Sequence, residues 1–180
     1  ELTLTGRDCG QPERAPMCGI PFHSYESYVA RLIAKGYKVA ICEQMEDPAL
    51  AKGLVKRDII RVITPGTVLE SSMLDESRNN YICSLCVSGM QAGICFADVS
   101  TGELHATTLT GKNAEELTQK LVNELSRFSP REILVGQEAL DLSTLPSFIK
   151  KRMSVSVELL SGEDFAAETC APLVKLGSVL

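Results

Sequence analysis

The chain has 180 residues and a net charge of −5, with 44% hydrophobic and 5% aromatic residues. This length suits one ordinary domain or two small ones, and the hydrophobic fraction is sufficient for a real core. An acidic chain without Trp is a poor non-specific binder of nucleic acid, because phosphate neutralisation requires clustered Lys and Arg. No apolar run of about 18 residues occurs, so the sequence predicts no membrane-spanning helix and no membrane partner.

The N-terminal sequence ELTLT has neither an initiator Met nor a charged-then-apolar leader. We therefore expect a fragment of a longer protein, without a signal peptide. The seven cysteines are odd in number and scattered, which is typical of free thiols in a reducing cytoplasm. Cys83 and Cys86 form a CxxC pair, but no second pair follows at a suitable distance, so we expect no metal site.

The first third of the chain predicts one helix and two strands. Residues 24–36 place apolar side chains on one helical face, with Ser24 as N-cap and Gly36 as the stop. Residues 37–42 (YKVAIC) and 58–64 (DIIRVIT) are short and largely apolar, which is typical of strands. We assign residues 1–67 to a first domain.

A connection with few large apolar groups follows Pro65-Gly66. We take residues 68–78 as a linker and residues 79–180 as a second domain. That domain begins with three strand-like runs, which are residues 81–87, 92–99 and 103–109, separated by turn residues. They predict an antiparallel meander.

A helix and further strands complete the second domain. Asn113 and Glu116 form a capping-box-like start, and Ser129-Pro130 ends the helix. Between them one helical face carries Leu117, Leu121, Leu125 and Phe128. Residues 132–135 (EILV) predict a short buried strand, and residues 153–160 alternate apolar and polar residues as a half-exposed strand does. The fold class is therefore α/β, with two small mixed α/β domains. The order of elements in the second is that of ribonuclease H-like domains.

That order raises an enzymatic alternative, a metal-dependent nuclease centred on Asp98. Such enzymes hold divalent metals with carboxylates from the first strand, a helix and a later strand. Here residues 81–87 contain no carboxylate, and Asp98 precedes the turn residues Ser100, Thr101 and Gly102. Asp98 is better explained as a side chain that accepts hydrogen bonds from turn amides.

One local run of positive charge stands out against the acidic average. Lys52, Lys56, Arg57 and Arg61 face only Asp58 between residues 52 and 61, four cations against one anion. The run suits contact with a phosphate backbone. It equally suits a solvated hairpin edge, where Lys and Arg prevent edge-to-edge pairing.

The block MCGIPFH at residues 17–23, preceded by LTGR at residues 4–7, resembles the mismatch-recognition domain of the bacterial MutS family of DNA mismatch repair proteins. The similarity continues through residues 28–33, 36–44, 52–57 and 61–67, in the order and spacing of the family. Residues 79–180 resemble the beginning of the family's connector domain more loosely, through Asn80-Tyr81 and residues 97–102 (ADVSTG).

The resemblance implies a dimeric ATPase that clamps duplex DNA, binds mismatched bases and recruits MutL. In the family a Phe-x-Glu motif reads the mispair, because a poorly stacked step is cheap to kink. No Phe-x-Glu occurs here, and we expect it before residue 1. We expect ATP and Mg²⁺ to bind only in the full-length protein. Within these residues we expect no cofactor and no enzyme activity, because Gly111-Lys112 lacks the rest of a phosphate loop.

The resemblance also implies DNA contacts for particular residues. Met17 lies in the block that packs beside the wedge and approaches the minor groove. Arg7 and Arg61 lie in blocks that flank DNA in the family, and the basic run supplies further phosphate contacts. The predicted DNA-binding residues are therefore Arg7, Met17, Lys52, Lys56, Arg57 and Arg61.

Overall fold

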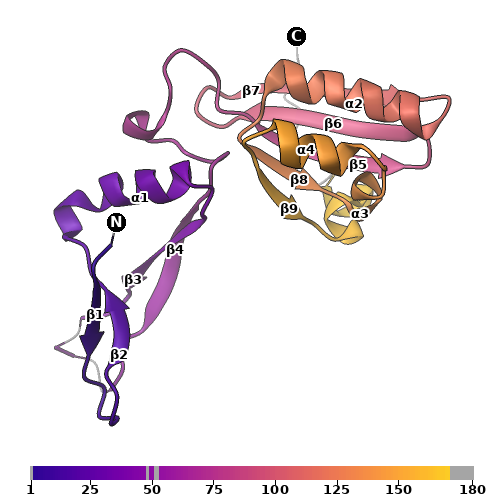
Figure 1. Cartoon of the computed structure of the whole chain (residues 1–180). Coiled ribbons are helices and arrows are strands. Elements are labelled where there is room, and N and C mark those ends of the chain that lie inside the picture. Colours follow the sequence, from indigo (N-terminus) through magenta and orange to yellow (C-terminus); the bar gives the residue numbers. More distant parts are fainter. Residues whose placement is uncertain (1, 48, 51–52, 171–180) are drawn as a thin grey trace.

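The computed structural model in Figure 1 describes residues 2–47, 49–50 and 53–170. It contains a first unit (residues 2–74) and a second unit (residues 79–170), each combining helices and strands, as the fold class predicted. The first unit consists of β1 (Leu4–Arg7), β2 (Ala15–Cys18), η1 (Phe22–Ser24), α1 (Tyr25–Ala34), β3 (Val39–Gln44), β4 (Arg57–Ile63) and η2 (Ser71–Met73).

Helix α1 is one residue shorter at the start and two shorter at the end than the predicted range of residues 24–36. Its start also differs from the prediction, because a 3₁₀ turn over residues 22–24 precedes it and Ser24 makes no side-chain cap. The Ser24 hydroxyl donates instead to the Pro21 carbonyl oxygen at 3.3 Å. Gly36 ends the helix at φ 82°, the left-handed conformation that glycine adopts without steric cost.

Two antiparallel hairpins form the rest of the first unit. β1 pairs with β2, and β3 pairs with β4. Strand β2 was not predicted, since its sequence APMC is short and contains Pro16, which suits only an edge strand. The core beneath α1 is small, with four buried side chains, which are those of Val29, Ile33, Ile63 and Val68.

A single five-stranded sheet organises the second unit. Its elements are β5 (Ile82–Ser88), β6 (Gln91–Asp98), β7 (Glu103–Thr110), α2 (Ala114–Phe128), β8 (Glu132–Val135), α3 (Gln137–Leu140), α4 (Leu145–Arg152), β9 (Ser156–Leu159), η3 (Gly162–Phe165) and α5 (Ala167–Cys170). The strand order is β7-β6-β5-β8-β9, with β5, β6 and β7 antiparallel and β8 and β9 parallel to β5. The meander is thus confirmed, and the order agrees with the predicted ribonuclease H-like arrangement.

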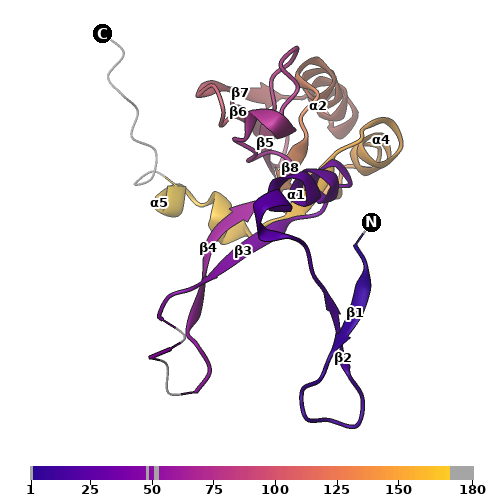
Figure 2. The same ribbon diagram turned by 90° about the vertical axis from the view of Figure 1, so that its left-hand side faces the viewer.

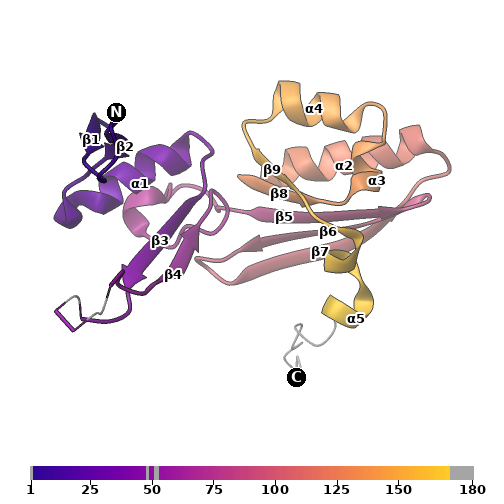
Figure 3. The same cartoon turned by 90° about the horizontal axis from the view of Figure 1, so that it is seen from below.

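Helix packing on one side of this sheet builds the main core. Figure 3 shows α2 and α4 on one side and α5 on the other. Leu117, Leu121 and Leu125 of α2 are fully buried, as their common face predicted. The helix begins at Asn113, whose side chain accepts a hydrogen bond from the Glu116 N–H at 2.9 Å. The Glu116 carboxylate reaches back to the Lys112 N–H, one residue before the position that a capping box requires.

The apolar side chains of edge strand β9 are exposed, although the alternation of its sequence predicts that they are the buried ones. Val157 and Leu159 are 43% and 53% exposed, while Ser156 and Glu158 are half-buried. The register explains this, because Val157 and Leu159 lie beside Ile133 and Val135 on the helix side but at the sheet margin. Glu158 lies on the opposite face, where the first unit meets the second.

Residues 68–78 connect the two units without forming a free linker. Val68 is only 2% exposed, and Met73 and Leu74 pack against the small core beneath α1. The connection therefore closes the first unit before the chain enters β5.

Candidate nucleic-acid interface

The two hairpins of the first unit extend from α1 on the side away from the second unit. Figure 2 shows β1–β2 and β3–β4 as two separate arms below α1, with the sheet of the second unit above it. Both arms carry residues that the sequence predicted to contact DNA, and their exposed surfaces leave room for a partner. Five of the six predicted residues lie in the described part of the chain, and Lys52 lies outside it.

The β1–β2 arm carries Arg7 and Met17. Thr5 lies opposite Met17 in the register, and its hydroxyl donates to the Met17 carbonyl oxygen at 2.9 Å. This bond fixes the strand at the point where the Met17 side chain, 42% exposed, faces outward. Arg7 lies at the end of β1, opposite Ala15, and is exposed. The arm thus exposes a thioether, which suits an apolar contact, and a guanidinium, a group that suits a phosphate contact.

A β-bulge at Ile60 divides the basic run of the β3–β4 arm. Ile41 pairs with Arg61 but Cys42 pairs with Ile59, so the alternation of side chains shifts by one residue. Arg61 therefore lies on the face toward α1, whereas Arg57 lies on the opposite face. The sequence suggested one patch, and the structure separates its two arginines.

Arg61 is engaged within the first unit. Its guanidinium donates to both carboxylate oxygens of Glu70, with Nη2 at 3.2 Å from Oε2. Partial burial acts to raise the pKa of Glu70, but hydrogen bonds from the backbone and from Arg61 outweigh it and hold that pKa below 4.5. A phosphate at Arg61 would have to compete with this carboxylate. Phosphate contact at Arg61 stays a prediction.

Lys56 and Arg57 are exposed near the end of the same arm. The Lys56 N–H donates to the Glu46 carboxylate at 2.6 Å, which fixes the backbone and leaves the ammonium group free of that bond. Arg57 donates to the Val55 carbonyl oxygen at 3.2 Å and forms no ion pair with any described carboxylate. Of the two arginines in the basic run, Arg57 is the one available to a phosphate group.

Asp98 is fully engaged in shaping a turn. Its Oδ1 accepts hydrogen bonds from the Ser100 N–H at 2.9 Å and the Ser100 hydroxyl at 2.6 Å, and its Oδ2 accepts the Asn80 N–H at 2.9 Å. Burial acts to raise the pKa of Asp98, but these hydrogen bonds outweigh it and lower the pKa from 3.8. Within the described ranges no three His, Cys, Asp or Glu side chains form a metal cluster. The nuclease alternative is not supported.

Residues 111–113 do not fit a nucleotide phosphate. The Lys112 N–H, which a phosphate loop would offer to the ligand, donates to the Glu116 carboxylate at 3.0 Å. A Cβ at Gly111 would lie 2.6 Å from the Leu117 nitrogen, so this glycine serves close packing against α2. No step involving ATP can be assigned to these residues. In the described part of the chain no helix is long and apolar enough to span a bilayer.

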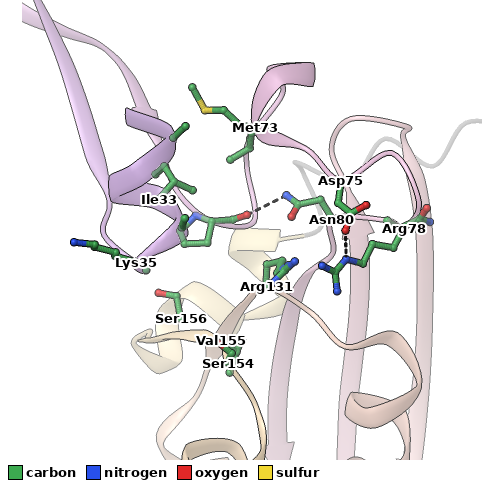
Figure 4. A pocket seen from close by; sticks show the side chains of 16 residues that line it. Ile33, Lys35, Met73, Asp75, Arg78, Asn80, Arg131, Ser154, Val155 and Ser156 are labelled. Carbon is green, nitrogen blue, oxygen red and sulfur yellow. Dashed lines mark hydrogen bonds and ion pairs between the residues drawn. The ribbon is translucent and has the colours of Figure 1, made fainter. Parts of the chain in front are cut away.

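A cavity of about 350 Å³ lies between the two units. Figure 4 shows Ile33 of α1 and Lys35, its C-cap, on one side of the cavity, Ser154 and Ser156 on another, and Arg131 pointing toward it. Asn80 crosses its margin and donates from Nδ2 to the Pro65 carbonyl oxygen at 3.0 Å. The cavity therefore separates the C-terminal end of α1 from residues 154–156, and the two units contact each other next to it, at Pro65 and Asn80.

Glu132 lies at that junction and was not among the predicted site residues. It is 1% exposed, and its Oε2 accepts hydrogen bonds from the Thr64 hydroxyl and from the Gly66 N–H at 3.0 Å. Its Oε1 lies 3.5 Å from the Lys38 ammonium nitrogen, which also pairs with Glu158. The signal in the sequence was a charged residue inside the apolar run EILV, since a buried charge requires partners.

Comparison with known proteins agrees with these two units. The family model for MutS domain I matches residues 1–72, and that for MutS domain II matches residues 80–171. The chain is 52% identical over 168 residues to the DNA mismatch repair protein MutS of Acetivibrio thermocellus, covering 93% of this chain and 19% of that protein.

Other relatives give the same picture. Identity is 50% to the DNA mismatch repair protein MutS of Ruminiclostridium cellulolyticum, over 92% of this chain and 19% of the relative. It is 47% to that of Clostridium tetani, over 92% and 18%. The chain thus spans about a fifth of the length of the curated relatives it matches. A solved Bacteroides thetaiotaomicron protein with an actin-like ATPase fold gives a TM-score of 0.40 at 17% identity, over 52% of this chain and 38% of that one, a likeness too distant to assign a fold.

Proposed function

Because the chain belongs to the MutS family, we propose that it serves DNA mismatch repair as the part of a longer MutS protein that holds two hairpin arms against duplex DNA. The observation that carries this proposal is the placement of Arg7, Met17 and Arg57 on arms that extend away from the second unit. Arginine contacts to phosphate position a protein on the duplex, and an apolar side chain beside a mispaired step favours a kink.

The proposal divides labour between the two units. The first unit contacts the mismatched duplex through its arms, and the second unit supports it and presents a surface to MutL. ATP and Mg²⁺ binding and the homodimer belong to the longer protein, in the cytoplasm. These residues supply no catalytic group to the ATPase.

The test compares two arginines of one strand in a full-length MutS that carries this chain. We expect Arg57→Ala to weaken binding of G·T-mismatched and matched duplexes about equally, and to reduce the salt slope of log K by about 1, as loss of one phosphate contact does. Arg61→Ala is the comparison variant. The family resemblance implies a phosphate contact for Arg61 too, but its guanidinium is held by Glu70, so we expect a smaller loss of affinity than in Arg57→Ala. Fluorescence anisotropy at several salt concentrations measures both quantities.

Two results would contradict the assignment. If Arg57→Ala weakened mismatched binding alone, Arg57 would read the mispair and not the backbone. If Arg61→Ala reduced the salt slope as much as Arg57→Ala, the Glu70 ion pair would open on DNA and the bulge would not separate two roles. Met17→Ala serves as the third variant, and we expect it to reduce the ratio of mismatched to matched affinity while leaving the salt slope unchanged.

A further inference from the structure

The contact between the two units is polar and local. The hydrophobic cluster beneath α1 and the cluster of the second unit are separate, so no shared apolar core joins the units in the described residues. Beside the contact lies the cavity of about 350 Å³, which leaves the end of α1 and residues 154–156 unpacked against each other (Figure 4). The relative orientation of the units therefore depends on a small number of directional contacts.

Apart from the hydrogen bond that Asn80 Nδ2 donates to the Pro65 carbonyl oxygen, these contacts converge on one buried carboxylate, that of Glu132. The docking loop, residues 64–67, lies against the paired residues Ile82 of β5 and Glu132 of β8. The Thr64 hydroxyl and the Gly66 N–H donate to Glu132 Oε2, and the Thr64 and Thr67 hydroxyls lie 2.8 Å apart. A carboxylate that is 1% exposed is costly to bury unless its oxygens are satisfied, so each partner is held firmly in place.

The docking loop approaches the sheet as closely as a backbone can. A Cβ at Gly66 would lie 2.8 Å from the Ile82 Cβ and 2.9 Å from the Glu132 Cβ, and neither atom is the end of a flexible side chain. Glycine is required here by the close approach, without any need for positive φ. Any larger residue at position 66 must lift the docking loop off the sheet.

Lys38 adds an electrostatic contact from a second element of the first unit. Its ammonium group lies 3.5 Å from Glu132 Oε1 and pairs with Glu158 of β9. Desolvation acts to lower the pKa of Lys38, but the hydrogen bond to Glu158 and the two nearby carboxylates outweigh it and raise the pKa above 10.5. The lysine is therefore charged at neutral pH and contacts both parallel strands at once.

We propose that Glu132, together with Lys38 and the docking loop, is the positioning site that fixes the angle between the two units, so that the hairpin arms and the five-stranded sheet move as one body. The carboxylate takes no part in chemistry and contacts no DNA. Its role in aiming the arms rests on the proposed function, whereas the rigidity itself does not.

The test is ¹⁵N NMR relaxation on this chain without DNA, so that failure of the inference and failure of the proposed function are distinguishable. In the wild type we expect one rotational correlation time for amides of both units. In Gly66→Ala and in Lys38→Met we expect two, each lower than the shared value by roughly a third, because two smaller bodies tumble faster than one.

Matched controls separate hinging from general damage. Gly19→Ala adds a Cβ where no atom lies within 4 Å, and Lys35→Met removes an exposed charge at the C-cap of α1. Both should retain the shared correlation time. Amide chemical shifts far from residues 64–66 show whether each unit stays folded in every variant.

A third variant tests the carboxylate directly. Glu132→Gln keeps the shape of the side chain but removes its charge and places an NH₂ group toward one of its donors, so it should behave as Gly66→Ala does. The inference is overturned if the wild type already shows two correlation times, or if Lys38→Met and Gly66→Ala both keep one. Should Glu132→Gln unfold either unit, Lys38→Met decides. The Lys38 side chain is 35% exposed, and after its removal Glu132 keeps its hydrogen bonds from Thr64 and Gly66.

Discussion

The two units differ in how much of their stability comes from their own cores. Four buried residues form the cluster beneath α1, whereas sixteen form the cluster of the second unit. Among the described residues, eighteen large hydrophobic side chains are exposed, and thirteen of them belong to the first unit. A surface that must contact another molecule cannot also be buried, so the unit that carries the arms has less core to stabilise it. The second unit, with its complete core, supplies the anchor.

The strongest test of whether the second unit anchors the first is to remove a core side chain from the second unit. Leu121 is fully buried in α2, and Leu121→Ala should cost about 3 kcal/mol of unfolding free energy through lost burial and the cavity left behind. If the first unit depends on its anchor at β8, its amides should lose hydrogen-exchange protection together with those of the sheet. Hydrogen exchange read by mass spectrometry follows both units in one experiment.

Loss of a core side chain from the first unit should not reduce hydrogen-exchange protection in the second unit. Val29→Ala removes a buried side chain from beneath α1 and should reduce protection in the first unit alone. Leu104→Ala, at a residue 60% exposed, is the surface control and should change neither unit. The comparison would be wrong if the first unit kept its protection in Leu121→Ala under conditions that unfold the second.

A medium effect is expected at Asp98, which belongs to the stable unit and has a lowered pKa. Asp98→Asn should cost about 2 kcal/mol at pH 7, because the amide NH₂ cannot accept a hydrogen bond that the carboxylate accepts. A carboxylate whose pKa is lower in the folded state stabilises above its unfolded pKa, near 3.9. That stabilisation is lost as the pH falls through the lower folded pKa.

The difference between wild type and Asp98→Asn should therefore be constant from about pH 5 to 7 and shrink below about pH 4. Urea unfolding at several pH values measures it. Asp141→Asn, on the surface of the same unit, should show no such change. If the difference in unfolding free energy between wild type and Asp98→Asn stayed constant down to pH 2, the charge of the carboxylate would contribute nothing to stability beyond the shape of the side chain.

The smallest expected effect sharpens the comparison at the two main helices. Asn113→Ala removes the side-chain cap of α2 and should cost about 1 kcal/mol. Ser24→Ala, at the same position of α1, should cost less than about 0.5 kcal/mol, since Ser24 makes no cap there. Thermal or urea unfolding distinguishes the two. Equal losses would show that the Ser24 hydroxyl contributes to the helix start in another way.

The sequence predicted well those features that depend on residues close together in the chain. The Asn113 start, the leucine stripe of α2 and the Pro65-Gly66 end of β4 each depend on residues a few positions apart, and all three are present. The turns between β5, β6 and β7 likewise required only neighbouring residues. The family resemblance supplied the rest of the identification, through ordered blocks in the first unit.

What the sequence could not predict depends on distant partners. The bulge at Ile60 changes which face Arg57 occupies, and no spacing rule in DIIRVIT indicates it. No helix was assigned to residues 137–152, where α3 and α4 lie, because these two short helices give no long periodic pattern in the sequence. The Glu132 contact joins residues 66 and 68 positions apart, so only the folded chain brings them together.

The position of that anchor has a consequence for synthesis of the protein. Gly66 leaves the ribosome before Glu132, which lies 66 residues later. At the usual rate of elongation the interval is roughly 3 to 13 s, far longer than a small unit needs to collapse. During that time the first unit exposes its isoleucines and both arms, and the second unit that anchors it has not yet formed. A chaperone that recognises such surfaces on nascent chains would find its opportunity in this interval, and would lose it once β8 joins the sheet.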